Sequence, residues 1–225
     1  NNTRLADLAS ITYNQNAEYI PMWGVLKSNF NFAAGERTDI GSIDLLRAMA
    51  KVEVNFAESF PSDYEIGTIT ISPYNTQGYC LPAGYTSVDA TGELDREEAG
   101  TAHSFNPLDS PSTNTSQSSI EFKGENKNYY IYLPEYDNST KPAKIQVTVN
   151  GETYDLEFKD YENGAPKDGT QYDIVRNHIY RYTITGVNDG KLIIKYKAMP
   201  WELVTSEIGY APQPMTTNPF SNEDD

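Results

Sequence analysis

Residues 173–201, which read DIVRNHIYRYTITGVNDGKLIIKYKAMPW, decide the fold of this chain. Apolar and polar side chains alternate on both sides of the segment 186–190, GVNDG. Because successive side chains of a strand point to opposite faces, each run predicts a strand with one apolar face. Asn, Asp and Gly tolerate the positive φ angles of tight turns, so the stretch predicts a β-hairpin. Pro200 should end it, because proline cannot donate to a ladder, and Trp201 brings a large apolar body to bury. The side chains expected on the apolar face are Tyr180, Tyr182, Ile184, Leu192, Ile194 and Tyr196.

The same two-residue alternation recurs upstream of this hairpin. We predict one continuous strand over residues 43–56, whose second half has apolar side chains at Ala50, Val52, Val54 and Phe56. Asn150-Gly151 is the strongest short hairpin signal in the chain. Further strands are predicted at 66–71 (with Ile69 and Ile71 inward), 119–122, 129–133, 144–148 and 153–158, and short apolar runs at 19–23 and 78–82 are read as strands or strand ends. With about eight short strands and no convincing long helix, the pattern predicts an all-β antiparallel β-sandwich.

Three other segments lack this alternation. Residues 1–20 are weakly patterned and predict a short helix or a fraying end. Residues 83–119 are rich in Gly, Pro, Ser and Thr and predict a long functional or mobile loop, and 160–170 predict a second, shorter loop. The tail after Trp201 is polar, contains three prolines and ends in acidic residues, so it is expected to be extended or disordered.

Composition excludes several classes of protein. The chain has 17 Lys and Arg against 32 Asp and Glu, a net charge of −15, and a field of that sign repels nucleic acid and anionic membrane surfaces. No apolar run approaches the roughly 20 residues of a membrane helix, so no transmembrane span is predicted. The single cysteine, Cys80, rules out an internal disulfide and is read as a core residue.

A search for catalytic or metal-binding residues finds none. His103 and His178 do not make a zinc site, which needs three or four ligands at recognisable spacings. The chain lacks a G-x-S-x-G elbow, a P-loop, a dinucleotide glycine pattern and a calcium loop. Adjacent acids at Glu97-Glu98 and Asp224-Asp225 are read as solvated surface. We therefore predict no enzyme activity, no cofactor and no metal.

Sheet edges are the remaining candidates for function, because an open edge can accept a strand from another chain. Residues 203–211, LVTSEIGYA, could supply such a strand. The candidate donor residues are Leu203, Val204, Ile208 and Tyr210. A disordered C-terminus is the alternative reading of the same residues.

The hairpin stretch also resembles a known family. Residues 175–187, VRNHIYRYTITGV, followed by Pro200-Trp201, resemble the closing motif of Bacteroidales fimbrillins, the subunits of type V pili and related surface proteins. Residues 20–24, IPMWG, and 45–52, LLRAMAKV, are similar to segments at the junction of that family's two domains. The resemblance covers about residues 19–202.

The resemblance implies a fold, a location and a mode of assembly. It implies transthyretin-like β-sandwich domains, export as a lipoprotein, and proteolytic removal of an N-terminal segment at the outer membrane. It also implies donor-strand exchange with other fimbrial subunits on the cell surface, without a cofactor. On this basis residues 1–42 are the end of an N-terminal domain and a linker, 43–202 the C-terminal sandwich, and 203–225 an extended tail. Most of the N-terminal domain should precede Ile20, so the chain is expected to be cut or to be a short member.

Three functions follow as hypotheses. The first is a structural fimbrial subunit that also contributes to adhesion. The second is a tip adhesin or binding module for host protein or glycan, suggested by the 17 tyrosines and the long loop, because aromatic rings stack on sugars and anchor protein contacts. The third is a hydrolase built on a β-sandwich.

Overall fold

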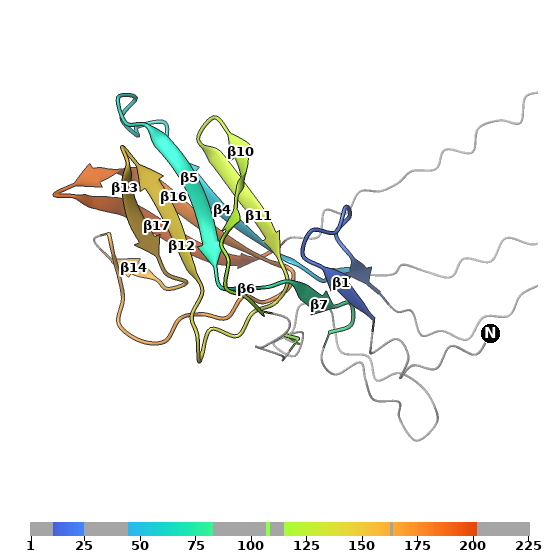
Figure 1. Cartoon of the computed structure of the whole chain (residues 1–225). Coiled ribbons are helices and arrows are strands. Elements are labelled where there is room, and N and C mark those ends of the chain that lie inside the picture. Colours follow the sequence, from blue (N-terminus) through green and yellow to red (C-terminus); the bar gives the residue numbers. More distant parts are fainter. Residues whose placement is uncertain (1–10, 25–44, 83–106, 109–114, 163, 202–225) are drawn as a thin grey trace, which may run out of the picture.

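Two facing sheets form the body of the molecule (Figure 1). The computed structural model describes residues 11–24, 45–82, 107–108, 115–162 and 164–201. The five-stranded sheet has the order β10 (Lys123–Glu125), β11 (Asn128–Leu133), β4 (Ala50–Phe56), β16 (His178–Asn188) and β17 (Lys191–Pro200). The four-stranded sheet has the order β13 (Glu152–Leu156), β12 (Lys144–Val149), β5 (Ile66–Ser72) and β9 (Ile120–Glu121). The all-β prediction is therefore confirmed.

Four small two-stranded sheets complete the described elements. Their pairs are β1 (Thr12–Asn14) with β7 (Gln77–Tyr79), β2 (Met22–Trp23) with β3 (Leu46–Arg47), β6 (Tyr74–Asn75) with β8 (Thr115–Ser116), and β14 (Tyr161–Glu162) with β15 (Ala165–Pro166). The pair β1–β7 lies beside one end of the sandwich (Figure 1). No helix in the described part of the chain is long and apolar enough to cross a bilayer.

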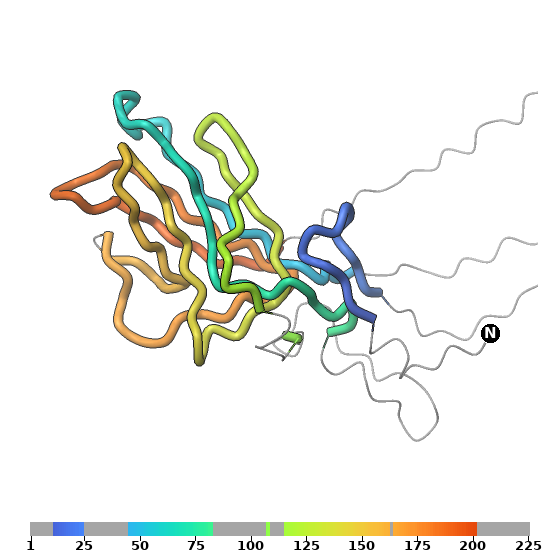
Figure 2. The backbone as a smooth tube through the Cα atoms, viewed as in Figure 1, coloured from blue at the N-terminus to red at the C-terminus, as the bar shows by residue number. Residues whose placement is uncertain are grey.

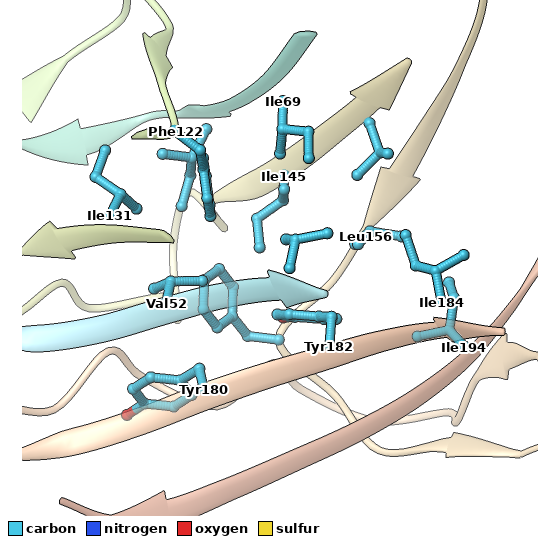
Figure 3. Packing of buried hydrophobic residues seen from close by; sticks show 14 of the residues in the cluster. Val52, Ile69, Phe122, Ile131, Ile145, Leu156, Tyr180, Tyr182, Ile184 and Ile194 are labelled. Atoms are coloured by element: carbon cyan, nitrogen blue, oxygen red, sulfur yellow. The ribbon is translucent and has the colours of Figure 1, made fainter. Parts of the chain in front are cut away.

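The core lies between the two sheets and is built as the alternation predicts (Figure 3). Val52, Tyr182 and Ile184 of the five-stranded sheet face Ile69 and Ile145 of the four-stranded sheet, and each is at most 2% exposed. Burial of such side chains is the main favourable term in folding, at roughly 25 cal/mol per Å² of apolar surface. The side chains predicted to point inward do so on both strands: Ile69 and Ile71 on β5, and Tyr180, Tyr182 and Ile184 on β16.

The hairpin predicted within residues 173–201 forms as expected. Residues of β16 and β17 pair from His178 with Pro200 to Asn188 with Lys191. The turn lies at Asp189-Gly190, with φ angles of 48° and 69°, at the end of the predicted GVNDG segment. A bulge between Ile184 and Gly186 shifts the register once. Asn150-Gly151 likewise forms a turn with φ angles of 49° and 79°, so that prediction is also confirmed.

The single strand predicted over residues 43–56 is wrong at its N-terminal end. Leu46–Arg47 pairs with β2 in a separate sheet, and the long strand begins only at Ala50. Between them, Ala48 donates its N–H to Pro21 O, and its carbonyl accepts a hydrogen bond from the Tyr13 hydroxyl. Because Ala48 and Met49 pack with Tyr13 in a second small core, the chain bends there instead of continuing the ladder.

The sandwich is not antiparallel throughout. β16 pairs with β4 in parallel, from Ile179 opposite Lys51 to Ile184 opposite Phe56. Alternation reports which face a side chain occupies, but it does not report which strand lies next to which. The prediction of an antiparallel sandwich is therefore corrected at this central pair, where two segments far apart in sequence meet.

Short strands account for the other differences. β1 lies inside the segment 1–20, predicted as a short helix or a fraying end. β14 and β15 form within the predicted 160–170 loop, and β8 lies inside the predicted 83–119 loop. Most of that loop, and Leu5 and Leu8, lie outside the described residues. Strands of two or three residues are too short for alternation to reveal. Trp201, expected to be buried, is only half-buried.

Glu53 was assigned to the polar face of β4, yet it is only 8% exposed. Lys51 Nζ lies 2.7 Å from Glu53 Oε1, and Arg181 Nε donates to Glu53 Oε2 at 2.6 Å. Burial alone would raise the pKa of Glu53, but the hydrogen bonds and charges of Lys51 and Arg181 together hold it below its usual value. Ionised Glu53 is thus the centre of a three-residue ion-pair network.

We expect Glu53→Gln to remove a pH-dependent part of the stability. Because the folded pKa of Glu53 is depressed, its contribution is fully present above the unfolded pKa of about 4.3 and is lost as pH falls through the folded pKa. Urea unfolding at pH 7 and at steps below pH 5 measures this. At pH 7 the free energy of unfolding should be larger for the wild type than for the variant, and this difference should disappear on acidification. A gap that widens below pH 4 contradicts the assignment.

Candidate functional site

One long side of the sandwich is closed by the chain itself. Residues 120–125 run from β9 in the four-stranded sheet directly into β10 in the five-stranded sheet (Figure 2). Phe122, at the crossing, is 6% exposed and belongs to the core. Its N–H donates to Ile69 O at 2.8 Å. A strand from another molecule therefore meets a continuous chain on this side.

The opposite side, where β13 and β17 are the edge strands, is open. Each of these strands has one sheet neighbour in the described part of the chain. Between them lies a groove of about 360 Å³. Its lining residues come from β13, from β17 and from the β14–β15 hairpin: Thr153, Tyr154, Asp155, Leu156, Tyr161, Gly164, Ala165, Pro166, Lys191, Leu192 and Ile194. We call it the β13–β17 groove.

The hairpin wall of the groove lies tightly against β17. Gly164 has a φ angle of 80°, which favours glycine, and a Cβ there would sit 3.1 Å from Leu192 O. Tyr161 extends this wall inward: its hydroxyl accepts a hydrogen bond from Glu157 N at 2.8 Å. Its ring lies 6.3 Å from that of Tyr182 and 6.4 Å from that of Tyr196. Burial raises the pKa of Tyr161 to about 12, so this wall stays uncharged at neutral pH.

The rims of the groove differ in charge. Lys191 of β17 and Asp155 of β13 line the groove, and both are exposed; Lys195 and Lys197 lie further along the same edge strand. Lysines on an edge strand oppose unspecific strand pairing. An apolar floor with polar rims suits an extended peptide segment, whose alternate side chains enter the floor while its backbone pairs with an edge.

A buried ion pair anchors the end of the molecule near β1 and β7. Arg176 and Glu135 are 1% and 2% exposed, and Arg176 Nη2 lies 2.8 Å from Glu135 Oε2. Glu135 Oε1 also accepts a hydrogen bond from Arg176 N at 3.1 Å. The same guanidinium donates to Tyr79 O and Cys80 O, both at 3.0 Å. One side chain therefore ties the segment before β16 to the end of β7.

The residue after Arg176 fixes the point where the C-terminal tail departs. Asn177 O accepts a hydrogen bond from Trp201 N at 2.7 Å, and Asn177 has a φ angle of 55°. The Trp201 ring stacks on Tyr132 with centroids 5.7 Å apart, and Arg47 lies 4.5 Å over the same ring. The three segments that carried the family resemblance thus meet at one junction.

The structure places the sequence-predicted residues as follows. The donor candidates Leu203, Val204, Ile208 and Tyr210, together with His103 and both acid pairs, lie outside the described residues. His178 is half-buried, with Nδ1 2.8 Å from Arg176 O. Cys80 is half-buried, and burial raises the pKa of its thiol. Within the described ranges no three His, Cys, Asp or Glu side chains converge as metal ligands do. Sequence reasoning missed Arg176 and Glu135, because a lone charged residue gives no sign of its burial.

The known relatives of this chain are fimbrial proteins. Residues 2–207 match the family described as fimbrillin-A associated anchor proteins Mfa1 and Mfa2. A curated relative, the major fimbrium tip subunit FimD of Porphyromonas gingivalis, is 26% identical over 168 residues, which cover 73% of this chain and 22% of that protein. The chain therefore spans about a fifth of that relative's length.

Solved structures from Bacteroidales show distant similarity. The tip fimbrial protein Mfa3 of P. gingivalis is 17% identical with a TM-score of 0.43, and the match covers 70% of this chain and 52% of that one. A Bacteroides uniformis structure assigned to cell adhesion is 13% identical with a TM-score of 0.43, covering 72% and 54%.

The described part of the chain is an all-β sandwich with one open flank, and its relatives are fimbrial proteins. The chain is a member of the family of fimbrillin-A associated anchor proteins, because that family's profile spans nearly all of it. The resemblance seen in the hairpin motif is confirmed.

Proposed function

We propose that this chain is a structural subunit of a type V fimbria on the bacterial cell surface, which joins other subunits by strand exchange and contributes to adhesion. The observation that carries the proposal is the β13–β17 groove, bounded by two edge strands and floored by core side chains. Family membership supports the fimbrial setting. We extend the proposal to a transthyretin-like topology, the three domain ranges given above, and maturation from an outer-membrane lipoprotein.

The position of Trp201 favours exchange between subunits over closure on the same molecule. Lys191, Leu192 and Ile194 line the groove at the start of β17, whereas Trp201 follows the end of that strand. Trp201 lies seven positions after Ile194, which is roughly 24 Å along the strand at about 3.4 Å per residue. A tail that paired with its own groove would have to reverse and retrace β17.

The composition of the tail supports its use as a donor. In an extended strand Val204, Ile208 and Tyr210 fall on one face, and Thr205, Glu207 and Gly209 on the other. Backbone pairing with β13 or β17 would give affinity, and the apolar face would fill the groove.

Deleting residues 203–225 should abolish polymerisation and leave the sandwich folded, because residues 50–196 already build the core between the two sheets. Electron microscopy and sedimentation measure assembly, and circular dichroism checks the fold. The triple variant Val204→Asp, Ile208→Asp, Tyr210→Asp should also fail to polymerise. The double variant Thr205→Asp, Gly209→Asp, on the opposite face of the predicted strand, should still polymerise. Filaments of normal length from the truncated chain would refute the role of the tail.

A tip subunit is the second candidate, favoured by two tip proteins among the relatives. A tip engages the fimbria at one end only. The purified chain would then remain monomeric alone and bind a shaft subunit one to one, which size-exclusion chromatography with light scattering distinguishes from polymer growth.

A further inference from the structure

The outer face of the five-stranded sheet, the face turned away from the core, has an unusual set of side chains. Strand register fixes which residues share it, because residues directly opposite one another in neighbouring strands lie on the same face. The central row crosses all five strands as Lys197, Arg181, Glu53, Tyr130 and Lys123. At about 4.8 Å per strand the row spans roughly 19 Å.

Two flanking rows extend this face. On one side Lys195, Thr183, Asn55, Asn128 and Glu125 lie in register, and on the other Met199, Ile179, Lys51 and Tyr132. The face therefore carries five cations, Lys51, Lys123, Arg181, Lys195 and Lys197, against two acids. One of these acids, Glu53, is already paired with Lys51 and Arg181. Lys123, Lys195 and Lys197 are exposed, and the Arg181 side chain is 42% exposed.

This excess is opposite in sign to the net charge of the whole chain, which is −15. The corresponding face of the four-stranded sheet is different: Thr70 and Glu121 are opposed there, as are Gln146 and Asp155, with Lys144 paired to Asp155 at 3.2 Å. Cations gathered on one sheet face of an acidic chain select an anionic partner for that face.

The spacing of the groups indicates the chemistry of the partner. Between the cations lie neutral hydrogen-bonding side chains, Thr183, Asn55 and Asn128, and the Tyr130 ring, which lies 5.5 Å from that of Tyr132. A uronic-acid polymer presents one carboxylate per acidic ring, separated by hydroxyls and apolar ring faces. Nucleic acid carries a charge on every phosphate and would meet the repulsion of the whole chain.

We propose that the outer face of the five-stranded sheet binds an acidic polysaccharide, with carboxylates or sulfates on Lys195, Lys197, Arg181 and Lys123 and sugar rings against Tyr130. A linear polymer lying across the strands could contact the central row of side chains from Lys197 to Lys123. The proposal is independent of strand exchange, because the β13–β17 groove opens between the sheets and not on this face.

Polygalacturonate binding to the 225-residue chain tests the proposal by biolayer interferometry at several salt concentrations. The double variant Lys195→Glu, Lys197→Glu should weaken binding about tenfold or more, because two attractions become repulsions. Lys141→Glu with Lys144→Glu changes the net charge equally, at the start of β12 in the other sheet and in the loop before it, and should leave affinity within about twofold. Neutral dextran should not bind.

The proposal would be overturned if the two double variants lost affinity for polygalacturonate equally, or if dextran bound as tightly as polygalacturonate. Tighter binding of single-stranded DNA than of polygalacturonate would also overturn it. Concentration-dependent dimerisation that the Lys195→Glu, Lys197→Glu variant abolishes, without polysaccharide binding, would assign the face to a second copy and also overturn it. Circular dichroism confirms that each variant is folded.

Discussion

Replacing Arg176 with Met should lower the free energy of unfolding by about 3–5 kcal/mol, because it leaves the Glu135 carboxylate buried without its cation. The same change removes the hydrogen bonds to Tyr79 O and Cys80 O. Buried carbonyls that lose their donors add to the cost. We therefore expect β7, and β1 paired with it, to loosen first.

A double-mutant cycle measures the effect. Urea unfolding of Arg176→Met, Glu135→Gln and the double variant gives the coupling free energy, and the double variant should recover part of the loss because no buried charge remains unpaired. Arg181→Met is the matched control: the Arg181 side chain is 42% exposed, and its partner Glu53 keeps the Lys51 cation, so the change should cost about 1 kcal/mol or less. Equal losses of unfolding free energy from Arg176→Met and Arg181→Met would contradict the structural role of the buried Arg176–Glu135 pair.

Ile184→Ala should cost about 2–5 kcal/mol, the range for removing a fully buried aliphatic side chain from a core. Ile184 is 0% exposed and lies in the core between the sheets, opposite Ile194 of β17 (Figure 3). Ile193, one strand away on the same hairpin, points to the other face and is 41% exposed. Ile193→Ala should therefore change stability by about 0.5 kcal/mol or less.

Thermal and urea unfolding of the two variants compare identical chemistry on opposite faces. Both substitutions remove the same atoms from the same hairpin, so strand propensity largely cancels in the comparison. A similar loss of stability from Ile184→Ala and Ile193→Ala would show that the hairpin does not have one buried and one solvated face.

Much of the sheet structure could be read from residues alone. The inward positions of Tyr180, Tyr182, Ile184, Ile69 and Ile71 followed from alternation, and all are buried. The Asn150-Gly151 turn followed from the tolerance of these residues for positive φ. The class of protein followed from the motif at 175–187, although the donor residues 203–210 remain a prediction.

The candidate site was far less predictable. The β13–β17 groove depends on which strands end up at the edges, and the cationic face depends on side chains from five strands coming into register. Arg176 reads in sequence as an ordinary exposed cation, and its burial appears only when Glu135 and residues 79–80 surround it.

By itself the sequence determined that the chain is all-β, where its main strands lie and which side chains face the core, because these depend on two-residue periodicity and turn chemistry within a few residues. Only the tertiary structure decided the parallel pairing of β4 with β16, the break at Ala48-Met49, the closed and open flanks and the buried Arg176–Glu135 pair. Those features arise from contacts between segments up to 128 residues apart, and local alternation holds no information about them.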